Sequence, residues 1–364
     1  MVQVKLKRTL KQVIPFGIIW LISALVYTFL EFGILGDSSY YPNTGNVYNF
    51  KVSLIYVCSG SFLMGLIQGW IEQVWFKKLF KRNPLWVKVV LKSSYYLMLI
   101  ILFLLTISVL ANSLILDVPI FDPVIIDISK KFFTSFSFWS IVIYIGVSLN
   151  IALFFSEISE YLGVEILYNF LFGKYHKPIK EIRIFMFLDM KSSTTIAEKI
   201  GHEIYFELIK QYYEDMTDAI LETEGEIYQY VGDEIVISWK EKTGLYKNNC
   251  IHCFKKIRDN FNVKENDYLH KYGLVPDFKA GYHIGEVTTG EIGIIKRDII
   301  YTGDVLNTAA RIQAKCNEYN TNVLISEELI LKLSKDATFQ YTEIGKLILR
   351  GKSETVKLCS INFD

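Results

Sequence analysis

The chain has 364 residues, of which 51% are hydrophobic, and its formal net charge is +1. This length suggests about two domains, and the balanced charge gives no expectation of nucleic-acid binding or of an acidic tail. The five cysteines are scattered and form no disulfide framework. Hydrophobic residues are concentrated in the first part of the chain, whereas most charged residues follow them. We therefore expect an apolar domain followed by a polar one.

Four apolar stretches lie in the first part, at about 13–35, 54–76, 94–116 and 136–156. A helix of about 20 residues crosses the hydrocarbon core of a bilayer, so each stretch is long enough to span a membrane. The first is not a cleavable signal, because three spans follow it and no small-residue cleavage site is evident. Residues 1–156 are predicted to form an α-helical bundle of four transmembrane spans.

Loop charge predicts how these spans are oriented. Basic residues are concentrated before the first span and between the second and third: Lys5, Lys7, Arg8, Lys11, Lys77, Lys78, Lys81, Arg82, Lys88 and Lys92. Positively charged loops remain in the cytoplasm. We therefore expect a multi-pass protein of the cell membrane (an inner or plasma membrane), in contact with the lipid bilayer, with both termini cytoplasmic.

Two carboxylates, Glu31 and Glu72, lie near the ends of predicted spans. Capping or snorkelling towards the interface is the simpler interpretation. A ligand or proton site is the alternative, because ionisable groups inside a membrane are costly. No residue in the spans identifies a ligand, so a ligand of the membrane domain is expected without a chemical class.

Residues 157–180 connect the two parts. Apolar residues recur there at helical spacing between Leu162 and Leu171, which predicts an amphipathic helix that continues from the fourth span. Gly173 and Pro178 then interrupt the pattern. The segment is interpreted either as a coupling helix that pairs with its copy in a dimer, or as a helix that lies on the bilayer or on its own domain.

Residues 181–364 alternate between strand and helix patterns. An apolar strand over 183–188 ends at Asp189, and two strands flank Gly232 and Asp233, where glycine permits a tight hairpin turn. Helices are expected at about 203–223, 247–261 and 304–319, with further strands at about 278–284, 323–326, 339–350 and 355–361. This alternation predicts an α+β, ferredoxin-like domain.

Three motifs in this domain carry chemistry. Asp189 and Asp233 each stand at the end of a strand, and two such carboxylates are plausible ligands for divalent cations that carry a polyphosphate. The third motif is Asn307-Thr-Ala-Ala-Arg311, whose first and last side chains share one helix face. The guanidinium fork of arginine binds phosphate oxygens in a fixed geometry.

Together the three motifs resemble the catalytic domain of class III nucleotidyl cyclases, the adenylate and guanylate cyclases, over roughly residues 180–361. The resemblance implies that ATP is converted to 3′,5′-cyclic AMP and pyrophosphate by attack of the ribose 3′-hydroxyl on the α-phosphate. It implies two Mg²⁺ or Mn²⁺ ions per site, bound by Asp189, Asp233 and the backbone carbonyl of Met190. It assigns ribose positioning to Asn307 and stabilisation of charge at the α-phosphate to Arg311.

The resemblance also implies a head-to-tail homodimer with its sites at the interface. The metal aspartates come from one chain and the Asn and Arg from the other, so a homodimer has two complete sites. Near the C-terminus, Arg350 and Lys352 resemble the segment that sends a basic residue to the terminal phosphates; a solvated basic turn is the alternative. The membrane domain is a hypothetical regulator.

Two positions depart from the family pattern. Adenylate cyclases usually carry a Lys where this chain has Gln229, and an Asp or Thr where it has Ile300. Gln donates and accepts hydrogen bonds, Ile does neither, and guanylate cyclases place an acidic residue at the position of Gln229. The predicted substrate is ATP, with GTP and a guanylate cyclase as the alternative.

Two further interpretations stay open. The segment from Gln229 to Glu234 superficially resembles the turn of diguanylate cyclases, which lack an Asn-x-x-x-Arg helix at this place. A nucleotide-sensing membrane receptor with a degenerate cyclase domain is favoured by Gln229 and Ile300. It is opposed by the presence of both aspartates and of Arg311.

Overall fold

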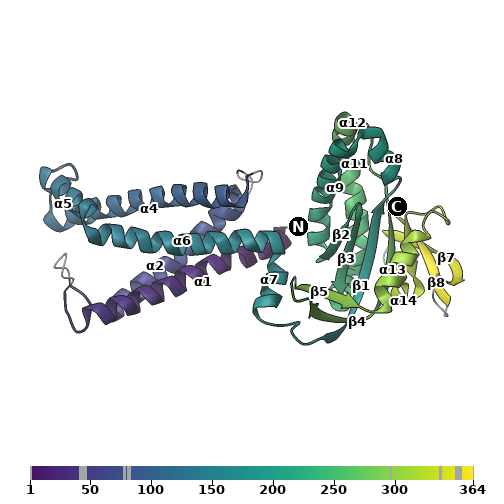
Figure 1. Ribbon diagram of the computed structural model, residues 1–364, viewed down its shortest axis with the longest axis horizontal. Helices are drawn as coiled ribbons and strands as arrows, with labels where there is room; N and C mark the ends of the chain where they lie inside the picture. Colours follow the sequence, from purple (N-terminus) through teal and green to yellow (C-terminus); the bar gives the residue numbers. More distant parts are fainter. Residues whose placement is uncertain are drawn as a thin grey trace. The chain divides into compact units, whose positions relative to one another are not determined.

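The computed structural model describes residues 2–40, 47–76, 79, 83–295, 297–335, 338–348 and 355–363. The chain forms two compact units (Figure 1). We call Val2–Tyr168 the helical unit and Asn169–Asp364 the sheet unit. Each unit has its own core, and each is described by itself.

The helical unit consists of α1 (Val2–Leu35), α2 (Phe50–Ile71), which continues as the π-helix η1 (Glu72–Phe76), α4 (Leu85–Leu116), α5 (Pro123–Thr134) and α6 (Phe136–Leu162). Among the described residues, four segments are long and apolar enough to cross a membrane: Gln12–Leu35, Phe50–Phe76, Leu85–Leu114 and Phe136–Tyr161. The four predicted spans are thus confirmed as apolar helices. The second and third begin earlier than expected.

Helix α5 lies between the third and fourth spans and was not predicted. Its beginning has a local cause: the Asp122 side chain accepts a hydrogen bond from the Val124 amide, and Pro123 stands at the first helical position. The signal is therefore present in the sequence, in a stretch that was interpreted only as a loop.

Helices α1 and α2 pack closely because α2 presents glycine to α1. A Cβ atom on Gly65 would lie 2.7 Å from the carbonyl oxygen of Phe16, and one on Gly69 would lie 3.1 Å from Val13. Small residues four positions apart allow two helix backbones to approach in this way.

The adjoining parts of α2–η1, α4 and α6 share a buried group of charged residues, which we call the ionic cluster. The Lys92 ammonium contacts the Glu72 carboxylate and lies 2.7 Å from Glu157 Oε1. Lys88 Nζ lies 3.4 Å from Glu157 Oε2, and the Tyr96 hydroxyl donates to Glu72 Oε2 over 3.3 Å. Snorkelling of Glu72 is therefore wrong, since its side chain is 4% exposed and paired. Lys88 and Lys92 likewise belong to α4 and not to a loop.

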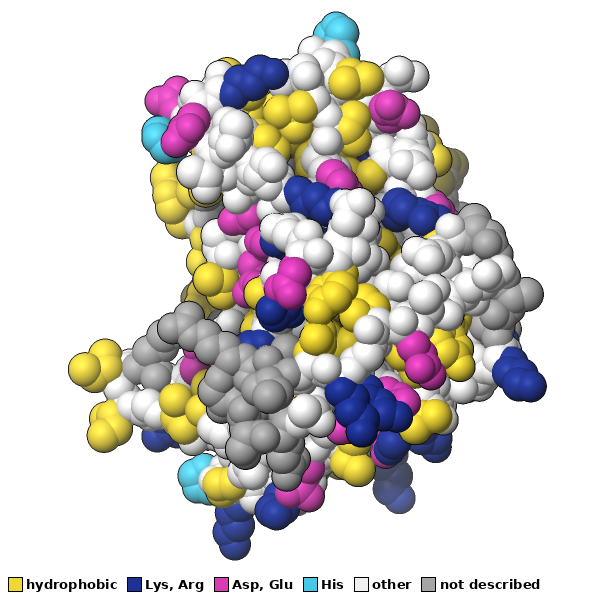
Figure 2. Space-filling view, turned by 90° about the vertical axis from the view of Figure 1, so that its right-hand side faces the viewer, with side chains coloured by type: hydrophobic (Ala, Val, Ile, Leu, Met, Phe, Trp, Pro, Cys, Tyr) yellow, Lys and Arg dark blue, Asp and Glu magenta, His cyan; other side chains and the backbone are white. Residues whose placement is uncertain are grey.

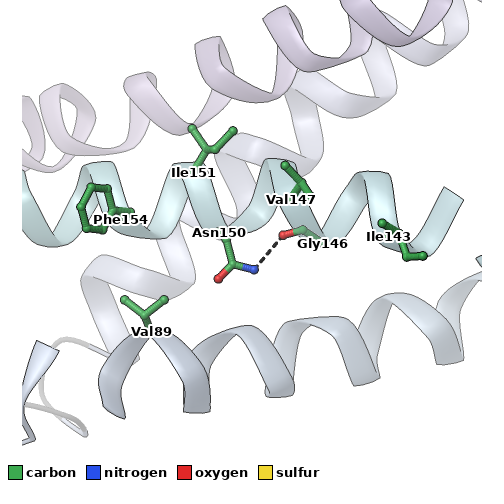
Figure 3. Close-up of a pocket in the computed structure, with 7 residues that line it drawn as sticks. All are labelled: Val89, Ile143, Gly146, Val147, Asn150, Ile151 and Phe154. Atoms are coloured by element: carbon green, nitrogen blue, oxygen red, sulfur yellow. Dashed lines mark hydrogen bonds between the residues drawn. The ribbon is translucent and has the colours of Figure 1, made fainter. Parts of the chain in front are cut away.

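A groove of about 580 Å³ lies between Val89 of α4 and the stretch of α6 from Ile143 to Phe154 (Figure 3). The Asn150 amide donates to the Gly146 carbonyl over 2.8 Å, and its side-chain oxygen accepts from Ser93 over 2.9 Å. The Asn150 side chain therefore has hydrogen-bond partners within α6 and α4, and the groove presents mainly apolar side chains.

The segment after the fourth span contains two helices. Helix α6 ends at Gly163, whose φ is +88°, and α7 (Val164–Leu171) begins directly after it. The prediction of one helix continuing from the fourth span is therefore wrong, because glycine at a positive φ ends α6. The coupling role of residues 157–180 stays a prediction.

The strands of the sheet unit are β1 (Ile179–Met190), β2 (Glu226–Val231), β3 (Glu234–Lys240), β4 (Phe278–Ile292), β5 (Asp298–Thr302), β6 (Val323–Ser326), β7 (Phe339–Ile348) and β8 (Thr355–Phe363). Its helices are α8 (Ser193–Ile200), α9 (His202–Glu222), α10 (Glu241–Leu245), the short 3₁₀ turn η2 (Tyr246–Asn248), α11 (Asn249–Val263), α12 (Glu265–Tyr272), α13 (Asp304–Ala314) and α14 (Glu327–Ile330). The sheet order is β2-β3-β1-β4-β6-β8-β7, with β5 paired to β4.

The order β2-β3-β1-β4, with helices between the strands, is the predicted ferredoxin-like arrangement. Alternate side chains of β1 divide the core between two faces of the sheet. Even-numbered residues such as Met186 pack with α9 and α11, whereas Phe185 and Phe187 pack with α13. Asp189 continues the odd-numbered row and so belongs to the face of α13.

Several elements of the sheet unit differ from expectation. Strand β4 continues to Ile292 instead of ending near 284, and β5, which was not expected, pairs with it. Helix α13 ends at Ala314 instead of near 319, and α12 was not expected.

On the face seen in Figure 2, acidic, basic and apolar side chains are interspersed. Exposed ion pairs such as Lys357 with Glu327, 2.8 Å apart, balance each other locally, as the net charge of +1 suggests.

Candidate active site

Asp189 stands at the end of the central strand β1. Its neighbours across the sheet are Glu234 in β3 and Lys279 in β4. The strand is buried along its apolar length, so the chain delivers this carboxylate to a rigid position with its side chain 26% exposed.

Asp233 is brought to Asp189 by the β2–β3 hairpin. The hairpin turn consists of Gly232, with φ of +63°, and Asp233 itself. The Tyr213 hydroxyl of α9 donates to the carbonyl oxygens of Gly232 and Glu234, over 2.8 and 3.1 Å. Because Glu234 lies opposite Asp189, Asp233 in the turn lies beside Asp189. The hydrogen bonds from Tyr213 of α9 hold the turn in this position.

Three carboxylates therefore gather at the ends of β1 and β3. Partial burial raises the pKa of Asp189, and the nearby charge of Asp233 raises it further. Burial also raises the pKa of Glu234 to about 7, followed by the charges of Asp189 and Asp233. Partial burial and, after it, the crowding of negative charge both disfavour the ionised carboxylates here, and a cation would relieve both effects.

Two side chains approach Asp189 from other elements. Gln313 of α13 donates from Nε2 to Asp189 Oδ2 over 3.1 Å. Lys279 Nζ of β4 lies 3.7 Å from the same oxygen. Both contacts reach Oδ2, so neither engages Oδ1.

The donor set suits a hard divalent cation, which prefers carboxylate and carbonyl oxygens. Within the described residues, no three or more His, Cys, Asp or Glu side chains form a group that holds a metal by itself. Asp189 and Asp233 therefore make a partial ligand set, as is usual for Mg²⁺ that also binds substrate phosphates. The Met190 side chain is buried in the core, and the role of its backbone carbonyl as a metal ligand stays a prediction.

The third motif lies on α13. Its buried face includes Thr308 and Ile312, whereas Asn307 is exposed and Arg311 half-buried. In the described part of the chain, no hydrogen bond or ion pair joins Asn307 or Arg311 to either aspartate. One chain thus brings the two aspartates together and presents Asn307 and Arg311 separately.

The two expected base-reading residues lie on different strands. Gln229 is exposed on β2, just after a bulge at Tyr228, and Ile300 is half-buried on β5, opposite Gly290. Their neighbours meet, since the rings of Tyr228 and Tyr301 lie 4.9 Å apart. The fold thus brings the two strands near each other without placing a hydrogen-bonding group at position 300.

Comparison with known sequences identifies the family. The profile of the adenylate and guanylate cyclase catalytic domain matches residues 174–360. The chain belongs to this family. It is 30% identical over 222 residues to adenylate cyclase 2 of Rhizobium meliloti (strain 1021), which covers 61% of each chain. It is 28% identical over 180 residues to the adenylate cyclase of Anabaena cylindrica, covering 48% of this chain and 36% of that protein.

A solved structure agrees on the fold. A bacterial light-regulated adenylyl cyclase matches with a TM-score of 0.52 at 18% identity, over 63% of this chain and 66% of that one. At this identity the match shows the cyclase fold alone. The chain spans about three fifths of the length of the first curated relative and less of the second.

Sequence reasoning missed three residues of this candidate site. Glu234 was visible beside Asp233, and its place opposite Asp189 follows once the hairpin is paired with β1. Lys279 and Gln313 gave no local signal, because their contact with Asp189 depends on packing between distant segments. Arg350 and Lys352 lie outside the described residues.

Proposed function

We propose that this member of the cyclase family is an adenylate cyclase that converts ATP into 3′,5′-cyclic AMP and pyrophosphate. The observation that carries the proposal is the facing pair of Asp189 and Asp233, with Asn307 and Arg311 on a helix of the same unit. The identity to relatives named adenylate cyclase supports ATP as the substrate.

Asp189, Asp233 and the Met190 carbonyl are the groups that bind two Mg²⁺ or Mn²⁺ ions in this proposal. When bound, such ions lower the pKa of the ribose 3′-hydroxyl and neutralise the triphosphate. The crowded carboxylates supply the negative potential that draws divalent cations to the end of β1.

Asn307 and Arg311 act on the substrate held by the partner chain. Asn307 orients the ribose, and Arg311 stabilises the charge that develops at the α-phosphate. The exposure of Asn307 and the absence of a bond from either residue to the aspartates in the described part of the chain support a homodimer with shared sites. A monomer then has no complete site.

We assign base recognition to Gln229, whose amide can pair with the adenine edge. Ile300 contributes an apolar contact at most, so discrimination against guanine is expected to be weak. Arg350 and Lys352 are assigned to the terminal phosphates of ATP.

The helical unit is proposed as the regulator. It spans the cell membrane with both termini in the cytoplasm, where ATP is available, as the basic residues before the first span and between the second and third indicate. Residues 1–156 form this membrane domain, 157–180 couple it to the catalytic domain, and 181–364 carry out the reaction.

The test is an assay of the full-length protein in lipid nanodiscs with ATP or GTP and Mg²⁺ or Mn²⁺, with products identified by mass. We expect cyclic AMP, and none from Asp189→Ala or Arg311→Ala. Mixing these two variants should restore about a quarter of the activity, because half of randomly formed dimers have one intact site of two. Cyclic GMP alone would replace the substrate assignment, and no cyclic product from a folded dimer would favour the nucleotide-sensing receptor.

A further inference from the structure

Gln313 joins the two halves of the proposed catalytic machinery within one chain. Its side chain donates to Asp189, and it belongs to α13, the helix that carries Asn307 and Arg311. The residue itself is 6% exposed. A buried amide at this position has few alternatives to its bond with the carboxylate, and an amide bonded to an ionised group is among the stronger hydrogen-bond types.

The backbone of Gln313 lies directly against the sheet. A Cβ atom on Gly281 of β4 would lie 2.2 Å from the Gln313 backbone nitrogen and 2.6 Å from the Ala309 backbone carbonyl oxygen. Helix α13 is therefore pressed directly on the sheet at this point. Close packing of this kind leaves little freedom for the side chain, so Gln313 presents Nε2 to Asp189 from a fixed place.

Asp189 Oδ2 has a second neighbour in Lys279, whose side chain is 12% exposed. Lys279 balances charge at 3.7 Å, whereas Gln313 fixes direction through a hydrogen bond at 3.1 Å. The two contacts hold Asp189 by Oδ2 and do not occupy Oδ1.

We propose that Gln313 is a positioning residue that couples the two shared sites of the dimer. This inference rests on the proposed function. In a homodimer with shared sites, Asp189 serves the site on its own chain, whereas the α13 helix of that chain serves the other site. Through its hydrogen bond, Gln313 links the orientation of Asp189 at one site to the helix that completes the opposite site.

The test replaces Gln313 with Met, which has a similar length and no hydrogen-bond donor. Full-length homodimers in nanodiscs are assayed at saturating ATP over a range of Mn²⁺ concentrations. We expect the Mn²⁺ concentration for half-maximal rate to rise about tenfold, the factor that corresponds to ~1.4 kcal/mol. The Hill coefficient should also fall towards 1. Gln340→Met, at an exposed position of β7, is the matched control and should change neither.

A heterodimer with one intact site separates positioning from general damage. One protomer carries Arg311→Ala and supplies the metal aspartates, and the other carries Asp189→Asn and supplies the helix. Gln313→Met in the first protomer should raise the Mn²⁺ requirement about tenfold, by the same relation. In the second protomer it should lower the maximal rate and leave the Mn²⁺ requirement unchanged.

The possible failures are distinguishable. If the wild-type protein forms no cyclic nucleotide, the proposed function fails before Gln313 is examined. If the wild type is active and Gln313→Met keeps its Mn²⁺ dependence and Hill coefficient, the coupling inference alone is overturned. Equal effects of Gln313→Met in the two protomers of the heterodimer would also overturn it, since they would indicate a loss of stability common to both chains.

Discussion

The helical unit has a cluster of buried charged side chains and the sheet unit has a cluster of partly buried ones, and the two clusters balance their charges differently. In the ionic cluster, the ammonium groups of Lys88 and Lys92 face the carboxylates of Glu72 and Glu157. In the described part of the sheet unit, the carboxylates of Asp189, Asp233 and Glu234 outnumber their cationic neighbour Lys279. The charges of the ionic cluster therefore sum to zero, whereas the carboxylates at the ends of β1 and β3 keep an excess of negative charge.

This difference teaches what each group of charges is suited to do. A balanced cluster ties helices together, because removing one member leaves a buried charge without its partner. An unbalanced cluster costs stability in the absence of a cation and gains most when one binds. Neutralising one residue should therefore have opposite effects on the stability of the two units.

The largest effect is expected from Lys92→Met. The substitution leaves Glu72 and Glu157 without the cation between them and should cost roughly 3–5 kcal/mol of unfolding free energy. Thermal unfolding in nanodiscs measures the change. Lys131→Met, which removes an exposed pair with Asp127, should have no measurable effect.

A second substitution sharpens this result. Lys92→Met combined with Glu72→Gln leaves Lys88 facing Glu157, so the cluster is neutral again and most of the lost stability should return. If Lys92→Met alone were as stable as the wild type, the cluster would not hold the helices together.

The next largest effect is expected from Gly281→Ala, in the sheet unit. The backbone of α13 approaches β4 closely at this glycine, and the new Cβ would lie 2.2 Å from the Gln313 backbone nitrogen. We expect a loss on the order of 3 kcal/mol and a greater loss of cyclase activity. Gly290→Ala on the same strand, whose nearest neighbour is Pro178 at 3.4 Å, should be tolerated. Equal stability of the two variants would contradict the close approach of α13.

A smaller effect of opposite sign is expected from Asp233→Asn. Without divalent cations, removing one of three crowded carboxylates should stabilise the sheet unit by about 1 kcal/mol, since one pKa unit corresponds to 1.36 kcal/mol. Cyclic nucleotide formation should be lost. Hydrogen exchange of β1 and β3 amides measures the stability of the sheet unit in the metal-free protein and in the presence of Mn²⁺. If Mn²⁺ protected the variant as strongly as the wild type, Asp233 would not be a ligand.

The smallest effect concerns pH. The pKa of Glu234 is raised to about 7 in the fold, so its protonated form is favoured there. The stabilisation of the fold by protonated Glu234 is present in full below the ordinary carboxyl pKa and is lost as the pH rises through about 7. In the metal-free protein we expect the unfolding free energy to decrease by only on the order of 1 kcal/mol over this pH range, because solvent screens a half-exposed carboxyl group. Exchange rates of β3 amides between pH 5 and 8 should show it, and Glu234→Gln should remove it.

Features with a local cause were predictable from the sequence. The four spans follow from the length of apolar stretches, and the β2–β3 hairpin follows from Gly232 between two strand patterns. The spacing of Asp189, Asp233 and the α13 motif was sufficient to indicate the family. The roles of these residues stay predictions.

Features that depend on distant contacts were not predictable. The bond between Gln313 and Asp189 joins residues 124 positions apart, and its geometry depends on the close approach at Gly281. The ionic cluster needed the packing of three helices, so Lys88 and Lys92 were interpreted as loop charges. The prediction of one continuous helix ran through Gly163, because apolar residues at helical spacing lie on both sides of it.

The break at Gly163 limits what kind of mechanical signal leaves the fourth span. A continuous helix transmits torque, because each turn fixes the angular phase of the next. At Gly163 the backbone ladder of α6 ends and α7 starts with a new phase, so a twist of α6 is not imposed on the residues that follow. If the helical unit regulates the sheet unit as proposed, tension along the chain is the form of signal that a joint of this kind can carry.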